Sequence, residues 1–348
     1  MIEKVEKKGG VRVYYVKKNY TDAETEKRLD KFITRNNILD IIDHDADVYD
    51  AETGKMLICF RKGKLKRDHL DMFYDNVIAF AKHKTSNRGS FSGSKNKTNG
   101  ENPKIMTNIV GYFDKLAPSQ KYSFKQLGMA LPKITVRPTR FLTDYPDKYK
   151  KLLPLINDID HYYKEYIPDR YQKQMKKARQ TPCHIGNTSF TTITTNVNNQ
   201  SAVHTDKGDD IEGFGNLTVI ERGEYAGGET CFPQYRIGVD VRCGDILFMD
   251  VHQPHGNLPI VYKTKDAIRL SIVCYLRKSI WLQTKGKTRK WFDSHVRKTF
   301  KRIKGIGTKG TVKNSSTGRG VPRSRESKDE LYKEEMEAVK FAYTAGGA

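Results

Sequence analysis

The sequence predicts a mainly β protein, a sandwich or barrel flanked by helices. Short runs rich in β-branched residues follow one another between residues 171 and 280, and Gly, Pro and Asn separate them at short intervals. The runs are 189–196, 217–220, 237–241, 245–249 and 270–275. This close spacing favours a sandwich or barrel over a sheet built from alternating β/α units. We expect residues 171–280 to form the core.

The N-terminal region, residues 1–170, mixes helical and strand signals, and we expect it to pack on the core and complete it. Apolar residues between Glu24 and Ile41 lie near helical spacing, and the same periodicity recurs at 69–82 and 146–166. A turn at 50–54 leads into the strand-like sequence MLICF. Ser, Asn, Gly and Lys dominate 85–101, which predicts a mobile surface loop.

The C-terminal region, residues 281–348, is a basic tail that contains aromatic residues. Between Arg277 and Arg325 the chain carries 16 Lys or Arg and one acidic residue, Asp293. Trp281, Trp291, Phe292 and Phe300 are interleaved with these charges. Further on, Ser327-Lys-Asp-Glu330 is typical of a capping box and predicts a helix at about 328–342.

The charge of the chain indicates a polyanionic partner. The 348 residues carry a formal net charge of +22, and nucleic acid is the simplest polyanion to match it. No apolar run approaches the length of a membrane span, and the first residues lack the apolar stretch of a secretory signal. We therefore expect a soluble intracellular protein, nuclear or cytoplasmic according to its host. The five cysteines form no CxxC pair, which predicts reduced, packed thiols rather than a zinc site.

Two short motifs in the β-rich region indicate a metal centre. His204 and Asp206 form an H-x-D pair, and residues i and i+2 of an extended segment project from one face. His255 follows the apolar run Gly-Asp-Ile-Leu-Phe and could supply a third ligand from a distant segment. Two His and one carboxylate with an open opposite face form the facial triad of non-haem Fe(II) oxygenases. His252 competes for the third position, but the Gly-Asn after His255 suits a turn at a barrel mouth, so we prefer His255.

An arginine inside the last apolar run suggests a carboxylate-binding pocket. Arg269 lies among Ala, Ile, Leu and Val side chains, and a buried guanidinium needs an anionic partner. A dicarboxylic cosubstrate could provide one, with its far carboxylate held by Arg269 and hydrogen-bonded by Ser271. Each motif alone is weak, since H-x-D pairs, turn histidines and strand-end arginines are common. Their ordered occurrence along one chain is the stronger signal.

With these residues in view, the sequence resembles the TET/JBP branch of the Fe(II)- and 2-oxoglutarate-dependent dioxygenases. The resemblance covers roughly 180–276 and rests on these segments: FTTITTNVNN, HTDKGD, GFGNL, YAGGETCFPQY, VDVRCGDILFMDVHQPHGN and IRLS. It implies a double-stranded β-helix, a jelly-roll of the cupin kind. It further implies Fe(II) held by His204, Asp206 and His255, with 2-oxoglutarate anchored by Arg269 and Ser271, and O2 as the oxidant.

The resemblance also implies a reaction, the hydroxylation of the 5-methyl group of a pyrimidine base in DNA, either 5-methylcytosine or thymine, with release of succinate and CO2. A base within a duplex must leave the stack to reach such a centre. We expect the basic tail, residues 277–325, to contact the nucleic-acid backbone. Candidate substrate contacts are Asn196, Asn198, His252 and Arg88, although a structural role for the asparagines and for His252 fits equally well.

Two alternatives remain open from the sequence. The first is another branch of the same oxygenase class, a prolyl or lysyl protein hydroxylase or a small-molecule hydroxylase. The second is a non-catalytic, basic nucleic-acid-binding protein on a degenerate oxygenase fold. Because the triad and Arg269 are all present, the catalytic hypothesis is the stronger one. The sequence makes no prediction of the oligomeric state.

Overall fold

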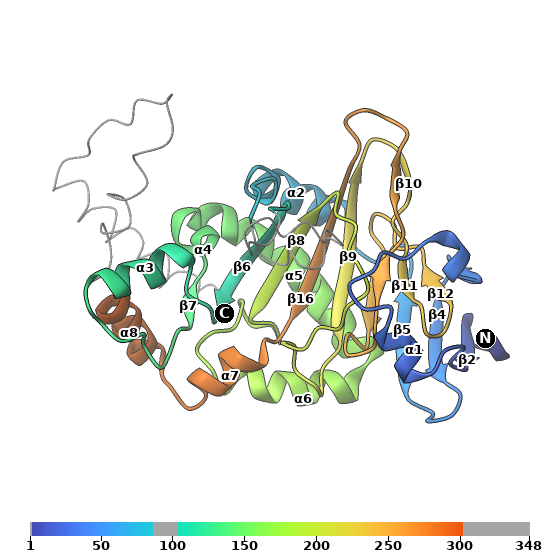
Figure 1. Ribbon diagram of the computed structural model, residues 1–348, viewed down its shortest axis with the longest axis horizontal. Helices are drawn as coiled ribbons and strands as arrows, with labels where there is room; N and C mark the ends of the chain where they lie inside the picture. The colour runs from blue at the N-terminus through green and yellow to red at the C-terminus, as the bar shows by residue number, and fades with distance from the viewer. Residues whose placement is uncertain (1, 86–103, 302–348) are drawn as a thin grey trace.

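The computed structural model describes residues 2–85 and 104–301 (Figure 1). Apart from Thr85, the predicted loop at 85–101 lies outside these residues, and so do Arg88 and the helix predicted at 328–342.

A large sheet dominates the fold, and its strands come from both halves of the chain. Its ten strands, in spatial order, are β1 (Ile2–Lys8), β2 (Val11–Val16), β4 (Ala46–Asp50), β5 (Met56–Arg61), β13 (Ile246–Met249), β9 (Gly215–Arg222), β16 (Ile268–Tyr275), β8 (Thr192–Val197), β6 (Thr107–Phe113) and β7 (Arg137–Pro138). All neighbours are antiparallel except β2 and β4. The N-terminal strands thus extend the same sheet that the β-rich region forms.

A smaller sheet packs against one face of the large one. Its four strands, in spatial order, are β14 (Gly256–Asn257), β11 (Thr230–Phe232), β12 (Ile237–Val239) and β3 (Asp40–Ile42). One apolar cluster joins the two sheets, since Leu217, Val219 and Val273 of the large sheet pack with Phe232 and Ile237 of the small one. A separate two-stranded ribbon pairs β10 (Tyr225–Gly227) with β15 (Ile260–Tyr262). The β core of two packed sheets agrees with the predicted jelly-roll class.

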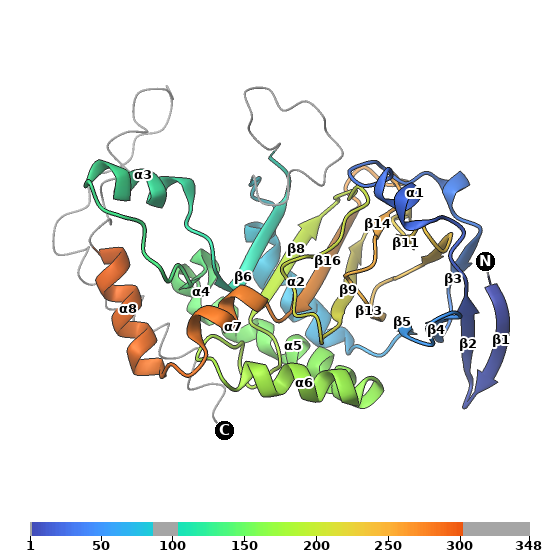
Figure 2. The ribbon, with the colours of Figure 1, turned by 60° about the horizontal axis from the view of Figure 1, so that its bottom comes forward.

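Helices cover the other face of the large sheet (Figure 2). The described helices are α1 (Asp22–Glu26), the short 3-10 helix η1 (Arg35–Asn37), α2 (Arg67–Ala81), α3 (Pro118–Gln126), α4 (Arg140–Asp144), α5 (Pro146–Tyr166), α6 (Pro168–Ala178), α7 (Lys278–Thr284) and α8 (Arg289–Lys301). The side chains of strand β16 alternate between the two faces of the large sheet. Leu270, Ile272 and Cys274 pack with the helices, whereas Val273 and Tyr275 face the small sheet.

The five predicted strand runs correspond to β8, β9, β12, β13 and β16, and the helices expected at 69–82 and 146–166 correspond to α2 and α5. The helix suggested between Glu24 and Ile41 is wrong. Only the five residues of α1 and the single turn of η1 are helical there. Asp30 adopts a left-handed φ of 62° and donates its amide to the carbonyl of Val203 at 2.8 Å, so tertiary pairing overrides the local periodicity.

The aromatic residues at the start of the predicted tail serve the core. Phe292 is fully buried and its ring meets that of Tyr112 edge-on, with 5.8 Å between the centroids. Trp281 and Trp291 pack against the same apolar cluster, and Phe300 packs beside Leu116. Phe292 is therefore enclosed by protein and cannot stack on a nucleobase.

Two further expectations concern thiols and membranes. All five cysteines are free thiols, and all but Cys243 are buried, which confirms the expected reduced and packed state. Burial raises the pKa of the thiols of Cys59 and Cys274 far above the ordinary value. Among the described residues, none of the helices combines the length and apolar character needed to span a bilayer.

Replacing Phe292 with alanine tests whether α8 is part of the folded core. We expect the Phe292→Ala variant to lose about 3–5 kcal/mol of the free energy of unfolding, because the change leaves a cavity beside Tyr112. Denaturant unfolding followed by circular dichroism measures this loss. Leu282→Ala on α7 is the matched control, since Leu282 is 48% exposed and should change stability by less than about 0.5 kcal/mol. Equal effects of the two substitutions would contradict the packing of α8.

Candidate active site

A single antiparallel bridge joins two distant segments of the chain at His204 and His255. The amide of each residue donates to the carbonyl of the other, and both N···O distances are 2.9 Å. Residues directly opposite in such a pair extend their side chains to the same side. The two imidazole centroids accordingly lie 4.5 Å apart. His255 leads directly into β14, which pairs with β11, so the bridge is anchored in the small sheet.

Asp206 brings a carboxylate to the two imidazoles. Its amide donates to the carbonyl of Val251 at 2.9 Å, which fixes the chain two residues beyond His204. Its Oδ1 lies 3.8 Å from Nε2 of His204, and its Oδ2 lies 3.8 Å from Nε2 of His255. One ligand atom from each residue lies within 4.8 Å of the other two, and all three residues are buried. We expected residues 204–206 to be extended like a strand, and they do not form a regular strand. The backbone hydrogen bonds to residues 251 and 255 nevertheless bring the three side chains together.

The hydrogen bonds of the imidazoles prepare them to bind a metal ion. Nδ1 of His204 lies 2.8 Å from the carbonyl oxygen of Ala202, and Nδ1 of His255 lies 2.9 Å from that of Gln253. A carbonyl only accepts, so each Nδ1 carries the proton and each Nε2 keeps its lone pair. Metal-binding histidines commonly show this arrangement. The ring of Phe232 lies 6.2 Å from that of His255 and makes an apolar wall beside the cluster.

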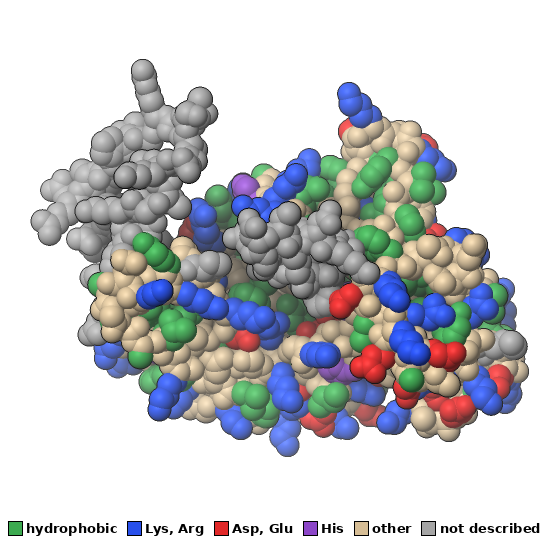
Figure 3. All heavy atoms as spheres, viewed as in Figure 1, with side chains coloured by type: hydrophobic (Ala, Val, Ile, Leu, Met, Phe, Trp, Pro, Cys, Tyr) green, Lys and Arg blue, Asp and Glu red, His purple; other side chains and the backbone are tan. Residues whose placement is uncertain are grey.

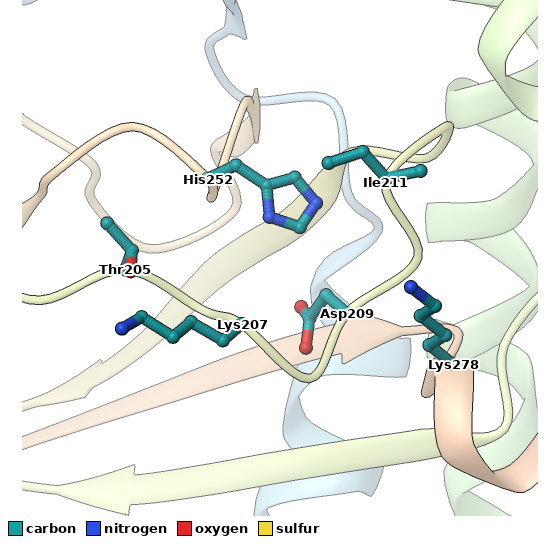
Figure 4. Close-up of a pocket in the computed structure, with 6 residues that line it drawn as sticks. All are labelled: Thr205, Lys207, Asp209, Ile211, His252 and Lys278. Atoms are coloured by element: carbon teal, nitrogen blue, oxygen red, sulfur yellow. The ribbon is translucent and has the colours of Figure 1, made fainter.

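His252 lies apart from this cluster, in a neighbouring pocket of about 280 Å³. The pocket is lined by Thr205, Lys207, Asp209, Ile211, His252 and Lys278 (Figure 4). Thr205 and Lys207 are sequence neighbours of His204 and Asp206, so the same segment of the chain contributes to both the pocket and the cluster. The geometry therefore groups His255, and not His252, with Asp206, while His252 faces the adjacent space.

Arg269 and Ser271 lie on the inner face of the large sheet, four and two residues before Val273 on the same strand. Arg269 is 5% exposed, and its Nε has no hydrogen-bond partner among the described residues. Gly228 lies against it, with φ at +80°, and a Cβ there would come within 2.9 Å of Nε. A buried guanidinium with an unsatisfied donor beside a residue without a side chain fits a carboxylate ligand.

Tyr225 forms part of the surroundings of Arg269. Burial raises the pKa of its hydroxyl well above the ordinary value, and the positive charge of Arg269 opposes that increase. The phenol therefore stays protonated across the physiological range and can act as a hydrogen-bond donor. Neither Tyr225 nor Gly228 was predicted from the sequence, although both belong to the motif YAGGETCFPQY. The paired glycines were the signal that could have indicated a close approach.

The two candidate asparagines have different roles in the structure. Asn198 is engaged with the strand that carries Arg269: its Oδ1 accepts from the amide of Arg269 at 2.7 Å and its Nδ2 donates to the carbonyl of Ala267 at 2.9 Å. These bonds occupy the side chain in positioning β16. Asn196 lies on the inner face, where its Nδ2 donates to Ser271 at 3.3 Å and its Oδ1 accepts from Thr107 at 2.9 Å.

Asn196 belongs to a polar row that crosses the inner face of the large sheet. The row continues on β8 with Thr194, whose hydroxyl lies 3.1 Å from that of Tyr275. Every member of the row is buried or half-buried. Thr107 could not be assigned to the row from the sequence, because it comes from β6, 89 residues before Asn196.

The loop after Asp206 is held from two sides. Asp210 is buried and accepts from the Nζ of Lys177 on α6 at 2.6 Å. Its amide donates to the carbonyl of Leu276 at 3.0 Å, directly after β16. Asp209 forms an isolated bridge with Arg277 and lines the pocket beside His252. These contacts hold the pocket-lining loop against α6 and the end of β16.

Comparison with known proteins agrees with this geometry. Residues 126–278 match the family model Tet_JBP, described as the oxygenase domain of the 2OGFeDO superfamily. The chain is 32% identical over 183 residues to the bifunctional helicase and thymine dioxygenase JBP2 of Leishmania braziliensis, which covers 53% of this chain and 15% of that protein. It is 28% identical over 241 residues to the thymine dioxygenase JBP1 of Crithidia fasciculata, covering 68% of this chain and 27% of that protein. The chain thus spans only a minor part of the length of these relatives.

A solved structure of NgTET1 in complex with 5mC DNA aligns with a TM-score of 0.38 and 14% identity, over 74% of this chain and 86% of that one. The family match covers Arg269 and all of the segment from His204 to His255. It agrees with the resemblance inferred from the sequence motifs: residues 126–278 are similar to the Tet_JBP oxygenase domain of the 2OGFeDO superfamily.

Proposed function

We propose that this protein is an Fe(II)- and 2-oxoglutarate-dependent dioxygenase that hydroxylates the 5-methyl group of a pyrimidine base in DNA, thymine or 5-methylcytosine. The observation that carries the proposal is the buried convergence of His204, Asp206 and His255. Two imidazoles and one carboxylate are the ligand set of non-haem Fe(II) oxygenases. The names of the relatives, thymine dioxygenases, support a nucleobase as substrate.

The residues of this chain divide the work. His204, Asp206 and His255 would hold Fe(II), while Arg269 and Ser271 would bind the far carboxylate of 2-oxoglutarate. Iron, 2-oxoglutarate and O2 together supply the oxidation that places a hydroxyl group on a C–H carbon and yields succinate and CO2. The two packed sheets exclude water from the cluster, and Phe232 shields its side near His255. The rigid hydrogen bonds at Nδ1 keep both imidazoles oriented before any ligand binds.

The pocket beside the cluster is the proposed place of the base. Its lining offers hydrogen bonds of both kinds, from Thr205 and His252 on one hand and Asp209 on the other. Hydrogen-bonding groups of both kinds suit the edge of a pyrimidine. The described part of the basic tail supports DNA as the partner, because Lys285, Lys287 and Lys290 are exposed on and before α8.

Substitution of the ligand candidates should separate His255 from His252. We expect Asp206→Ala and His255→Ala each to weaken Fe(II) binding by at least about a hundredfold, because each removes one of three ligands. His252→Ala should retain iron, since His252 lies outside the cluster. Anaerobic titration with Fe(II), followed by calorimetry, measures both. Loss of iron from the His252 variant with retention in the His255 variant would reverse the assignment.

Substitution at Arg269 tests the cosubstrate pocket independently of iron. Arg269→Gln should raise the 2-oxoglutarate concentration needed for half-saturation by roughly tenfold to a hundredfold, as expected for loss of a charged hydrogen-bonded pair. Gly228→Ala should act in the same direction, because its Cβ would lie 2.9 Å from Nε of Arg269. The charge-transfer absorbance of the anaerobic complex reports 2-oxoglutarate binding, and Fe(II) affinity serves as the control. Unchanged 2-oxoglutarate binding in both variants would contradict this pocket.

The substrate is tested by product analysis. The purified chain is incubated with Fe(II), 2-oxoglutarate, ascorbate and DNA that contains thymine or 5-methylcytosine, and the nucleosides are examined by mass spectrometry. We expect a hydroxymethyl product on one of the two bases, absent from the Asp206→Ala control. Succinate formation without a new nucleoside would exclude the nucleobase and favour a protein or small-molecule substrate.

A further inference from the structure

Four cationic side chains lie along the rim where β6 and β16 end and β7 begins, and we call them the rim row: Lys115, Arg137, Lys278 and Lys207. Phe113 at the end of β6 is paired with Arg137 of β7. Nε of Arg137 donates to the carbonyl of Lys115 at 3.2 Å. On the other side, the amide of Lys278 donates to the carbonyl of Gly208 at 3.0 Å, next to Lys207. The row ends at the pocket, which Lys207 and Lys278 line.

Arg277 holds the two halves of the rim row together. Its Nε donates to Oδ1 of Asp114 at 2.5 Å, and its guanidinium lies 5.0 Å from the centre of the Phe113 ring. The same side chain passes close to Gly208, where a Cβ would meet it at 3.0 Å. Arg277 therefore links the end of β6 with the loop that carries Lys207. It also neutralises Asp114, the acidic residue between Phe113 and Lys115.

Carboxylates near the rim row balance only part of its positive charge, since Asp114 is paired with Arg277 and Asp209 lines the pocket beside Lys207 and Lys278. None of its four members forms an ion pair within residues 2–85 and 104–301. Arg137 is half-buried and donates only to backbone carbonyls, those of Lys115 and Pro138. Burial lowers the pKa of its guanidinium, which Asp114 only partly offsets. A cation that is held in place and enclosed without a counterion suits an external anion.

The charged side chains on the face of the molecule seen in Figure 3 are unevenly distributed. Figure 3 shows Lys and Arg side chains spread over the face formed by α3, β7 and α7, whereas over α1 and the strands near it Asp and Glu side chains are mixed with Lys and Arg. A polyanion that approaches this face is attracted more strongly to its α3 and α7 end.

We propose that the rim row is a track for the sugar-phosphate backbone of the DNA strand whose base enters the pocket. This inference rests on the proposed function and adds to it the path of the strand. Lys207 and Lys278 would contact the phosphates beside the target nucleotide, and Arg137 and Lys115 would contact phosphates further along. Contacts of this kind fix the position of a strand without reading its sequence. All four members of the rim row lie within the described residues.

The test compares two double variants of the full chain that remove the same charge from different places. Lys115→Gln/Lys278→Gln removes two exposed members of the rim row. Lys55→Gln/Lys151→Gln removes two exposed lysines elsewhere, on the β4–β5 turn and on α5. Binding of a fluorescent DNA duplex is measured by anisotropy at several salt concentrations, and thermal unfolding verifies that each variant is folded.

We expect the rim variant to bind DNA about tenfold more weakly at low salt, with the slope of log affinity against log salt reduced by about two, one for each lost phosphate contact. The control variant should keep a slope close to that of the unsubstituted chain. Arg137→Gln should weaken binding further, and Arg137→Lys should restore part of it. An equal loss of DNA affinity in the rim and control variants, or no loss in the rim variant, would contradict the proposed track.

The outcome separates this inference from the proposed function. Suppose that the unsubstituted chain hydroxylates a base, and that the rim variant binds DNA as tightly as the unsubstituted chain. In that case only the proposed track is wrong. If the unsubstituted chain hydroxylates neither base but the rim variant loses DNA binding, the track stands as a DNA-binding surface and the proposed reaction is wrong.

Discussion

The pair of backbone hydrogen bonds between His204 and His255 is the constraint on which the rest of the site depends. It brings two imidazoles from segments 51 residues apart to one side of a two-residue bridge. Asp206 reaches the same point because its own amide is tied to Val251. The ligand atoms thus converge through main-chain geometry, and the imidazole Nδ1 atoms are then fixed by carbonyls. The side chains need little reorganisation to accept an ion.

The division of β16 between two environments explains how one strand serves both stability and chemistry. Its Leu270, Ile272 and Cys274 pack under the helices, where they gain from burial. On the opposite face, Arg269 and Ser271 lie in the polar row, next to an asparagine and a glycine that shape their surroundings. Asn198 holds the backbone of Arg269 on the edge of this row. A buried guanidinium is thereby kept rigid, although its Nε has no partner among the described residues.

The sequence was sufficient for the features that local pattern controls. β-branched runs located the strands of the core, and the order of H-x-D, distal histidine and buried arginine located the convergent residues. It failed where a tertiary contact decides the conformation. Residues 24–41 have helical spacing, yet Asp30 leaves the helical region to pair with Val203. Phe292 appeared to be an available aromatic in a charged tail, but its burial against Tyr112 depends on a strand 180 positions earlier. Thr107 and Gly228 carry no pattern that relates them to Arg269 or Asn196.

The pairing of residues 30 and 31 with Val203 has a consequence for how the protein forms. The amide of Asp30 donates to Val203, and the amide of Val203 donates to the carbonyl of Lys31, so the first part of the chain lies beside the residue that precedes His204. Contacts of such long sequence separation close large loops and are slow to form. The surroundings of His204 therefore depend on residues 30 and 31 as well as on the β-rich region that carries the histidine itself.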